Sequence, residues 1–195
     1  YDIMPSLVGS EMCIRDRFDR AGPLHDERRF HYLSASALLD VPYESSAGSY
    51  VEFAQWLRRN SASPREDLLE LFRRMVFNLA VGNSDDHVKN HGALRDPERG
   101  WRLAPAFDLV MQLGVHTGYQ ELAILPGRHA SSLELARQAA PQFGLDALEA
   151  EAVIERIGDT VALQAAASVE SAGGNRALTE RVKDFIAQQA TRIVA

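Results

Sequence analysis

Residues 68–90 read LLELFRRMVFNLAVGNSDDHVKN, an apolar stretch that runs directly into a cluster of polar side chains. Apolar residues recur in its first part at the three- and four-residue spacing of a buried helix face, at Leu68, Leu71, Phe72, Met75, Val76, Leu79 and Ala80. Gly82 follows and is typical of a helix end. The stretch therefore predicts a core helix over 68–81 that holds a polar loop on a rigid scaffold.

The polar loop at 82–90 and the segment after it place a carboxylate, an amide and a second carboxylate in order along the chain. Asp85 is followed five residues later by Asn90, and Asp108 ends the segment APAFD at 104–108. In protein kinases an Asp accepts the proton of the substrate hydroxyl, and an Asn and a second Asp hold Mg²⁺ on the ATP phosphates. The alternative is an ordinary polar turn, because Asp and Asn side chains bond nearby backbone. The core helix in front of the loop favours the catalytic interpretation.

A β-hairpin is predicted between Asn90 and Asp108. Two short apolar runs, at 92–94 and 101–103, flank a turn sequence that contains Asp-Pro and closes with Gly100. A hairpin brings its two ends together, so we expect Asn90 and Asp108 to share one metal ion.

These motifs resemble the C-terminal domain of the HipA family of bacterial serine/threonine kinases. The resemblance rests on GNSDDHVKN at 82–90 and WRLAPAFDLV at 101–110, and FDR at 18–20 and YLSA at 32–35 also fit. It implies a mainly α (α+β) fold like the C-lobe of a protein kinase, helical with a small β-hairpin next to the catalytic loop.

The HipA resemblance also implies a reaction and a set of roles. Asp85 would be the catalytic residue, Asn90 and Asp108 would bind Mg²⁺, and His87 and Lys89 would stabilise the loop or contact ATP. The reaction would be Mg²⁺-dependent transfer of the ATP γ-phosphoryl group to a Ser or Thr of a protein substrate. The family further implies a toxin paired with a helix-turn-helix antitoxin.

The same loop contains a departure from the family and a second possible metal pattern. Asp86 stands where the family often has a small residue or Asn, and it adds negative charge beside Asp85. His87 and His91 are four residues apart and, with a neighbouring Asp, resemble a metal-binding pattern. No H-E-x-x-H motif accompanies them, so a zinc hydrolase is a minor alternative.

Residues 1–17, YDIMPSLVGSEMCIRDR, have neither helix nor strand periodicity, and their second half resembles translated sequencing-adapter sequence. We therefore divide the chain into a non-native segment at 1–17 and a HipA-like C-terminal kinase domain at 18–195. The alternative is a poorly ordered native terminus.

Two parts of a complete kinase have no counterpart in the sequence. Neither a glycine-rich phosphate loop nor a strand lysine for the ATP phosphates occurs. By resemblance these belong to an upstream nucleotide-binding region, so we expect the chain alone to be inactive. A hypothesis of a different class is a catalytically silent module that binds an antitoxin or another protein. The intact Asp85, Asn90 and Asp108 favour the enzyme.

Composition narrows the possible partners and the compartment. The chain has 195 residues with 21 basic and 27 acidic side chains, and its net charge of −6 argues against direct binding to nucleic acid. The single cysteine, Cys13, suits a reducing cytoplasm. No apolar run reaches the length of about 18 residues that a membrane-spanning helix needs, so no membrane partner is expected.

Further helices are predicted from apolar periodicity and from Gly and Pro breaks. They cover residues 27–39, 50–58, 133–140, 146–165 and 178–193, with a Gly-Gly-Asn loop at 173–175 before the last. Arg73 and Arg74 are predicted to lie on the solvated side of the core helix.

Overall fold

The computed structural model describes residues 18–21, 28–42, 47–114 and 118–194, so the predicted non-native segment at 1–17 lies outside the described residues. The α-helices in these ranges are α1 (Ala35–Leu38), α2 (Tyr50–Asn60), α3 (Pro64–Ala80), α4 (Leu133–Ala139), α5 (Ala147–Ser171) and α6 (Arg176–Val194). The strands are β1 (Arg20–Ala21), β2 (Arg28–Arg29), β3 (His31–Ser34), β4 (Gly92–Asp96) and β5 (Gly100–Leu103). Two 3-10 turns, η1 (Val88–Asn90) and η2 (Ala140–Phe143), complete the set.

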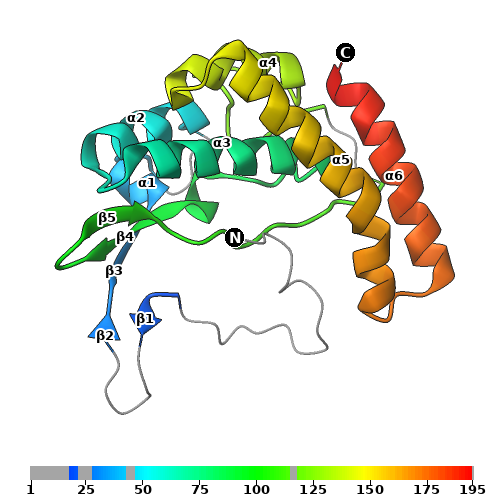
Figure 1. Cartoon of the computed structure of the whole chain (residues 1–195), viewed down its shortest axis with the longest axis horizontal. Coiled ribbons are helices and arrows are strands. Elements are labelled where there is room, and N and C mark those ends of the chain that lie inside the picture. The colour runs from blue at the N-terminus through cyan, green and yellow to red at the C-terminus, as the bar shows by residue number, and fades with distance from the viewer. Residues whose placement is uncertain (1–17, 22–27, 43–46, 115–117, 195) are drawn as a thin grey trace.

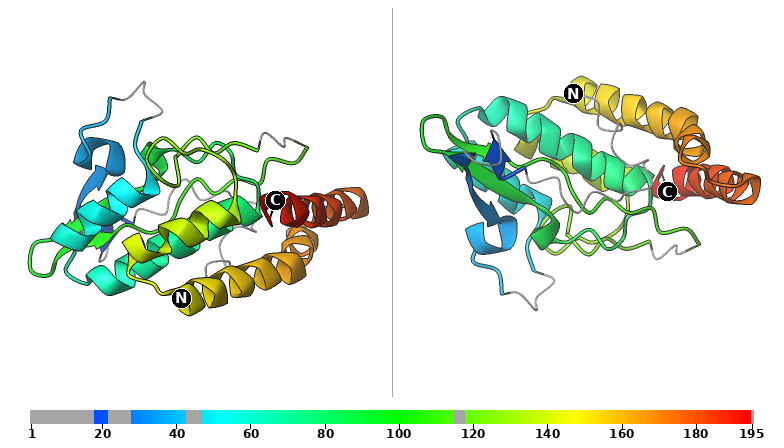
Figure 2. Two further views of the ribbon diagram at one scale, coloured as in Figure 1. Left: turned by 90° about the horizontal axis from the view of Figure 1, so that it is seen from above. Right: turned by 90° about the horizontal axis from the view of Figure 1, so that it is seen from below.

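Helix α3 runs through the middle of the molecule and the other elements are arranged around it (Figure 1). Strands β3, β4 and β5 and helix α1 lie near one end of α3, and α5 and α6 lie side by side at the other. The α5–α6 pair extends beyond that second end when the molecule is turned (Figure 2). Helix α3 therefore joins these strands to the α5–α6 pair, and it contributes Leu71 and Phe72 to one hydrophobic cluster and Phe77 and Ala80 to the other.

The predicted core helix is confirmed as α3. Pro64 occupies its first turn, where a missing N–H costs nothing, and Glu66 and Asp67 place negative charge at the positive end of the helix dipole. Leu71 and Phe72 are fully buried in the main core. The apolar periodicity of the sequence thus marks the face of α3 that packs on its neighbours.

The assignment of Arg74 to the solvated side of α3 is wrong. Its side chain is only 7% exposed, its Nη1 donates to the Ala104 carbonyl at 2.7 Å, and its Nε donates to Glu70 at 3.0 Å. A buried guanidinium needs such partners, because desolvating a charge without them is costly. Arg74 thereby ties α3 to the chain that leaves β5.

The predicted helix over 27–39 is also wrong, because most of this segment is extended. Strand β3 pairs antiparallel with β4, and Ser34 lies opposite Gly92. The aromatic ring of Tyr32 lies so close to Gly92 that a Cβ there would come within 2.5 Å of it. Only after Ser34, whose hydroxyl accepts from the Ala37 N–H at 3.3 Å, does the short helix α1 begin. Pairing with a distant strand has overridden a local helical pattern.

The predicted hairpin is confirmed as β4 and β5, and it is part of a three-stranded antiparallel sheet in the order β3-β4-β5. Its turn is held by Asp96, whose carboxylate accepts the backbone N–H groups of Glu98 at 2.8 Å and Arg99 at 3.3 Å. Gly100 closes the turn with φ +90°, a conformation that favours glycine. Asp96 and Gly100, which predict the turn from the sequence, are therefore the residues that stabilise it.

The remaining predicted helices are confirmed as α2, α4, α5 and α6, with shifted ends. Helix α5 begins with a capping box between Asp146 and Glu149 and continues to Ser171, six residues beyond the predicted end. Gly173 lies in the turn before α6 with φ +79°. None of the helices within the described residues is long and apolar enough to cross a membrane.

Helix α6 closes over the C-terminal end of α3. The Gln189 amide, which is 5% exposed, donates to the Leu79 carbonyl at 2.9 Å. The ring of Phe185 lies against Gly82, where a Cβ would come within 2.7 Å of it. These contacts fix the point at which α3 gives way to the polar loop.

We expect replacement of Gln189 by Ala to lower the free energy of unfolding by about 1–2 kcal/mol, because a buried hydrogen bond and its packing are lost. The neighbouring Gln188 is exposed, so its replacement by Ala is the matched control and should change stability by less than about 0.5 kcal/mol. Urea unfolding followed by circular dichroism measures both. Equal stability of the two variants would contradict the proposed contribution of the Gln189 hydrogen bond to the free energy of unfolding.

Candidate active site

The polar loop starts where α3 ends. The Val81 N–H makes a last helical bond to the Phe77 carbonyl at 2.9 Å, and Gly82 then turns the chain with φ +64°. The Asn83 N–H bonds back to the Asn78 carbonyl at 2.9 Å. Because glycine adopts this left-handed conformation without steric cost, the helix can end and the loop can leave it within two residues.

Asp86 is the buried anchor of the loop, and it is only 1% exposed. Its carboxylate accepts hydrogen bonds from the Tyr50 hydroxyl, on α2, and from His91 Nε2 at 2.9 Å, just before β4. His91 is itself buried and its ring packs edge-on against that of Tyr50. The extra charge noted in the sequence therefore points into the core, away from solvent, and has two partners there.

The hydrogen bonds of Asp86 continue into α3 through Tyr50. Asn78 donates to the Tyr50 hydroxyl at 3.0 Å and in turn accepts from Asn83 at 3.2 Å. Burial, followed by the nearby Asp86 carboxylate, raises the pKa of Tyr50 well above its usual value. The phenol therefore stays protonated at neutral pH and remains a donor to Asp86.

A later segment of the chain braces the outer side of the loop. The N–H groups of Glu121 and Leu122 donate to the carbonyls of Ser84 at 3.1 Å and Asp86 at 2.7 Å. The Ser84 hydroxyl also donates to the Gln112 side chain. The backbone on both sides of Asp85 is thus held by segments far from it in sequence.

The three predicted site residues differ from this network in having no partners. Asp85 is exposed, Asp108 is exposed, and Asn90 is 7% exposed at the end of η1. Within the part of the chain that the structure describes, their side chains make no hydrogen bond or ion pair. Polar groups held in place but left without partners are suited to bind a ligand.

The hairpin brings the chain after β5 back to the polar loop, as the sequence predicts. The Ala104 N–H donates to the Gly92 carbonyl at 2.9 Å, two residues after Asn90. The Gln112 side chain, farther along, is bonded to Ser84. Asp108 lies midway between these two attachment points, four residues from each, so its segment is held beside the loop that carries Asn90.

Asp108 has an unusual backbone conformation, with φ +57°. Non-glycine residues rarely adopt it, although Asp and Asn do so more readily than others. Such strain persists only where the surroundings impose it, and it is concentrated at functional sites. Among the described non-glycine residues only Asp40 and Asp108 have a positive φ, and Asp108 is the one that follows the β4–β5 hairpin.

The other two predicted site residues are half-buried, with His87 directly before η1 and Lys89 within it. His87 Nδ1 is shielded from solvent and has no hydrogen-bond partner among the described residues. The loop is not a continuous helix, and His91 uses its Nε2 on Asp86, so the two histidines do not form one helical metal-binding face. The roles of His87 and Lys89 stay predictions.

The donor set suits Mg²⁺ held jointly with a phosphate. In the described ranges no group of three or more His, Cys, Asp and Glu side chains is arranged to hold a metal ion. Asn90 and Asp108 offer one amide oxygen and one carboxylate, both hard oxygen ligands. Mg²⁺ commonly takes one or two protein oxygens and completes its shell with water and phosphate, so these residues fit such an ion.

Sequence reasoning missed the residues that position the site. Arg74 and Asn78 are buried polar residues four apart on α3, and they bond to the chain after β5 and to Tyr50. The two residues have the spacing of the apolar face of the helix. Two polar residues at positions on such a face would have indicated buried hydrogen-bonding groups. Nothing in the sequence alone marks Asp86 as the buried member of the Asp85–Asp86 pair.

Comparison with known proteins relates this arrangement to a family. The family described as HipA-like C-terminal domain matches residues 4–166. "Putative kinase Y4mE" of Sinorhizobium fredii is 30% identical over 151 residues, which cover 73% of this chain and 35% of that protein. "Putative kinase Y4dM" of the same organism is 29% identical over 96 residues, covering 49% of this chain and 24% of its own length.

A solved structure confirms the fold. HipA of Shewanella oneidensis MR-1, in a complex with HipB and operator DNA, superimposes with a TM-score of 0.73 at 17% identity over 91% of this chain. The chain spans 46% of that protein, and about a third of Y4mE. The mainly helical α+β fold and the resemblance seen in the sequence are both confirmed, and the chain belongs to the family of HipA-like C-terminal domains.

Proposed function

We propose that the chain is the phosphotransfer half of a HipA-type toxin kinase, which moves the ATP γ-phosphoryl group to a Ser or Thr hydroxyl of a protein. The observation that carries this proposal is the contrast between the predicted site residues and Asp86. Asp85, Asn90 and Asp108 occur in the kinase order, and their side chains make no hydrogen bond or ion pair with other described residues. Asp86, by contrast, is buried and hydrogen-bonded to Tyr50 and His91. The names of the relatives support the kinase class.

Asp85 orients the acceptor and takes its proton. Its carboxylate is exposed, so an incoming hydroxyl can reach it. As the hydroxyl oxygen forms a bond to the γ-phosphorus, the bond to the β-phosphate oxygen breaks, ADP leaves, and the proton passes to Asp85. The rigid backbone on either side keeps the carboxylate in place, and positioning of this kind supplies much of the catalysis in phosphoryl transfer.

Asn90 and Asp108 would hold the Mg²⁺ that accompanies ATP. When bound, Mg²⁺ neutralises charge that develops on the phosphates. Asn90 lies in η1 and Asp108 has a constrained backbone, so the backbone positions from which both side chains extend are set without the ion. His87 and Lys89 lie in the same loop and stabilise it or contact the phosphates.

Efficient transfer requires residues beyond this chain. Kinases grip ATP with a glycine-rich loop and a strand lysine, and neither motif occurs in these 195 residues. The chain spans about a third of Y4mE. We place those functions in a longer protein and expect the isolated chain to be inactive.

We also propose the partner and the compartment. The related Shewanella HipA is crystallised with HipB and operator DNA, which supports an antitoxin partner with its own DNA-binding domain for the longer protein. The net charge of −6 is unfavourable for DNA contact by this chain itself. With a partner that binds DNA, we propose a cytoplasmic location.

Replacing Asp85 with Asn should lower phosphotransfer by about 10²–10⁴-fold in a full-length protein that carries this domain, because the proton acceptor is lost. The exposed Asp159 on α5 provides the matched control, since Asp159→Asn makes the same chemical change at a position outside the loop. Phosphate incorporation from labelled ATP and growth inhibition in cells measure the effect. If toxicity survives in Asp85→Asn while the protein still binds its antitoxin, the chain acts as a binding module.

Replacing Asp108 with Gly should remove most of the Mg²⁺ dependence of nucleotide binding in the same protein. Glycine accepts φ +57° without strain, so this variant deletes the ligand and leaves the backbone conformation accessible. Isothermal titration calorimetry with ATP, with and without Mg²⁺, measures the difference. An unchanged Mg²⁺ effect would remove Asp108 from the metal site, and Asp159→Asn again serves as the control.

A further inference from the structure

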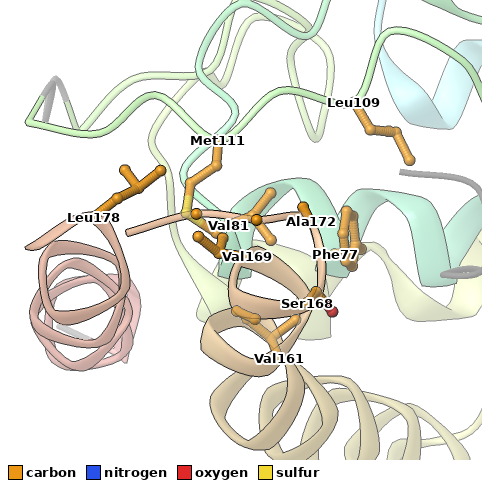
Figure 3. Close-up of a pocket in the computed structure, with 12 residues that line it drawn as sticks. Phe77, Val81, Leu109, Met111, Val161, Ser168, Val169, Ala172 and Leu178 are labelled. Carbon is orange, nitrogen blue, oxygen red and sulfur yellow. The ribbon is translucent and has the colours of Figure 1, made fainter. Parts of the chain in front are cut away.

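An apolar cavity of about 380 Å³ lies beside the candidate active site, at the end of α3 that faces α5. Its walls include Phe77 and Val81 from α3, Val161 and Val169 from α5, and Leu109 and Met111 from the segment after Asp108. Figure 3 shows these side chains converging from three separate parts of the chain. The turn between α5 and α6, with Leu178, closes another side.

The lining determines what kind of molecule fits. None of the twelve lining residues carries a charge, and Ser168 supplies the single side-chain hydroxyl among them. A charged ligand would lose its hydration here without gaining a partner, which is costly. The volume falls within the range of about 300–1,000 Å³ of small-molecule sites. Size and chemistry together favour a small, uncharged and mostly apolar ligand.

We propose that this cavity is a binding site for a neutral, mostly apolar small molecule, aromatic or branched aliphatic, with at most one hydrogen-bonding group. Its affinity would come from apolar surface removed from water, at about 25 cal/mol per Å² before the cost of association. The proposal goes beyond the proposed function and does not depend on it. It concerns a site separate from Asp85, Asn90 and Asp108.

The position of the cavity gives the occupant contact with both halves of the candidate active site. Val81 immediately precedes Gly82, where the polar loop begins, and Leu109 immediately follows Asp108. An occupant therefore touches the two segments from which the loop and the second carboxylate emerge.

Fluorescence titration of the 195-residue chain with N-phenyl-1-naphthylamine, an uncharged apolar probe, tests the proposal. The wild-type chain should bind one probe saturably. Ala165 lines the cavity and Ala167 is exposed on the same helix, so Ala165→Phe and Ala167→Phe make one chemical change inside and outside the site. Binding should weaken at least tenfold in Ala165→Phe and stay unchanged in Ala167→Phe. Equal affinities, or no saturable binding to the wild-type chain, would overturn the proposal.

A second pair of variants, on the opposite wall of the cavity, tests the proposal independently should Ala165→Phe fail to fold. Met111→Trp fills the cavity from a loop, and Val110→Trp changes the adjacent residue, which is 48% exposed and outside the lining. The first should weaken probe binding and the second should not. Sedimentation velocity tests a competing occupant, since a wild-type dimer that Ala165→Phe dissociates would assign the cavity to a second copy of the chain and overturn the small-molecule proposal.

Discussion

The buried carboxylate of Asp86 is the constraint on which the rest of the structure depends. A carboxylate removed from water must be hydrogen-bonded, or its desolvation destabilises the fold. Here the donors come from α2 through Tyr50 and from the start of β4 through His91, and Asn78 of α3 supports Tyr50. The Leu122 N–H holds the backbone carbonyl of the same residue. Two helices, a strand and a distant loop must therefore all be in place before Asp86 can be buried.

Two adjacent acidic residues consequently have opposite surroundings. Asp86 is enclosed and bonded, whereas Asp85 is exposed and has no bonded neighbour among the described residues. The two residues are adjacent, but one side chain is buried and the other is exposed. Hydrogen bonds from the Glu121 and Leu122 N–H groups to the Ser84 and Asp86 carbonyls hold the backbone on both sides of Asp85. A loop with a hydrogen-bonded backbone and an exposed carboxylate that has no hydrogen-bond partner can position that carboxylate and leave it free to bind a ligand.

Local patterns predict part of this fold, and long-range contacts decide the rest. Helix α3 and the β4–β5 hairpin follow from periodicity and turn residues, which act over a few positions. Strand β3 could not be found in this way, because its bonds go to β4, about sixty residues away in the chain. The order of Asp85, Asn90 and Asp108 is visible in the sequence, but the burial of Arg74 depends on a carbonyl thirty residues away. Proximity of that kind exists only in three dimensions.

The contact between Gly82 and Phe185 links two positions that are about a hundred residues apart. The ring occupies the space that any side chain at Gly82 would need, and the positive φ there independently favours glycine. Related sequences that keep this helix should therefore vary at the two positions in a correlated way, with the aromatic ring tolerated only where the partner is glycine. Helix α6 thus limits which residues can stand at the start of the polar loop.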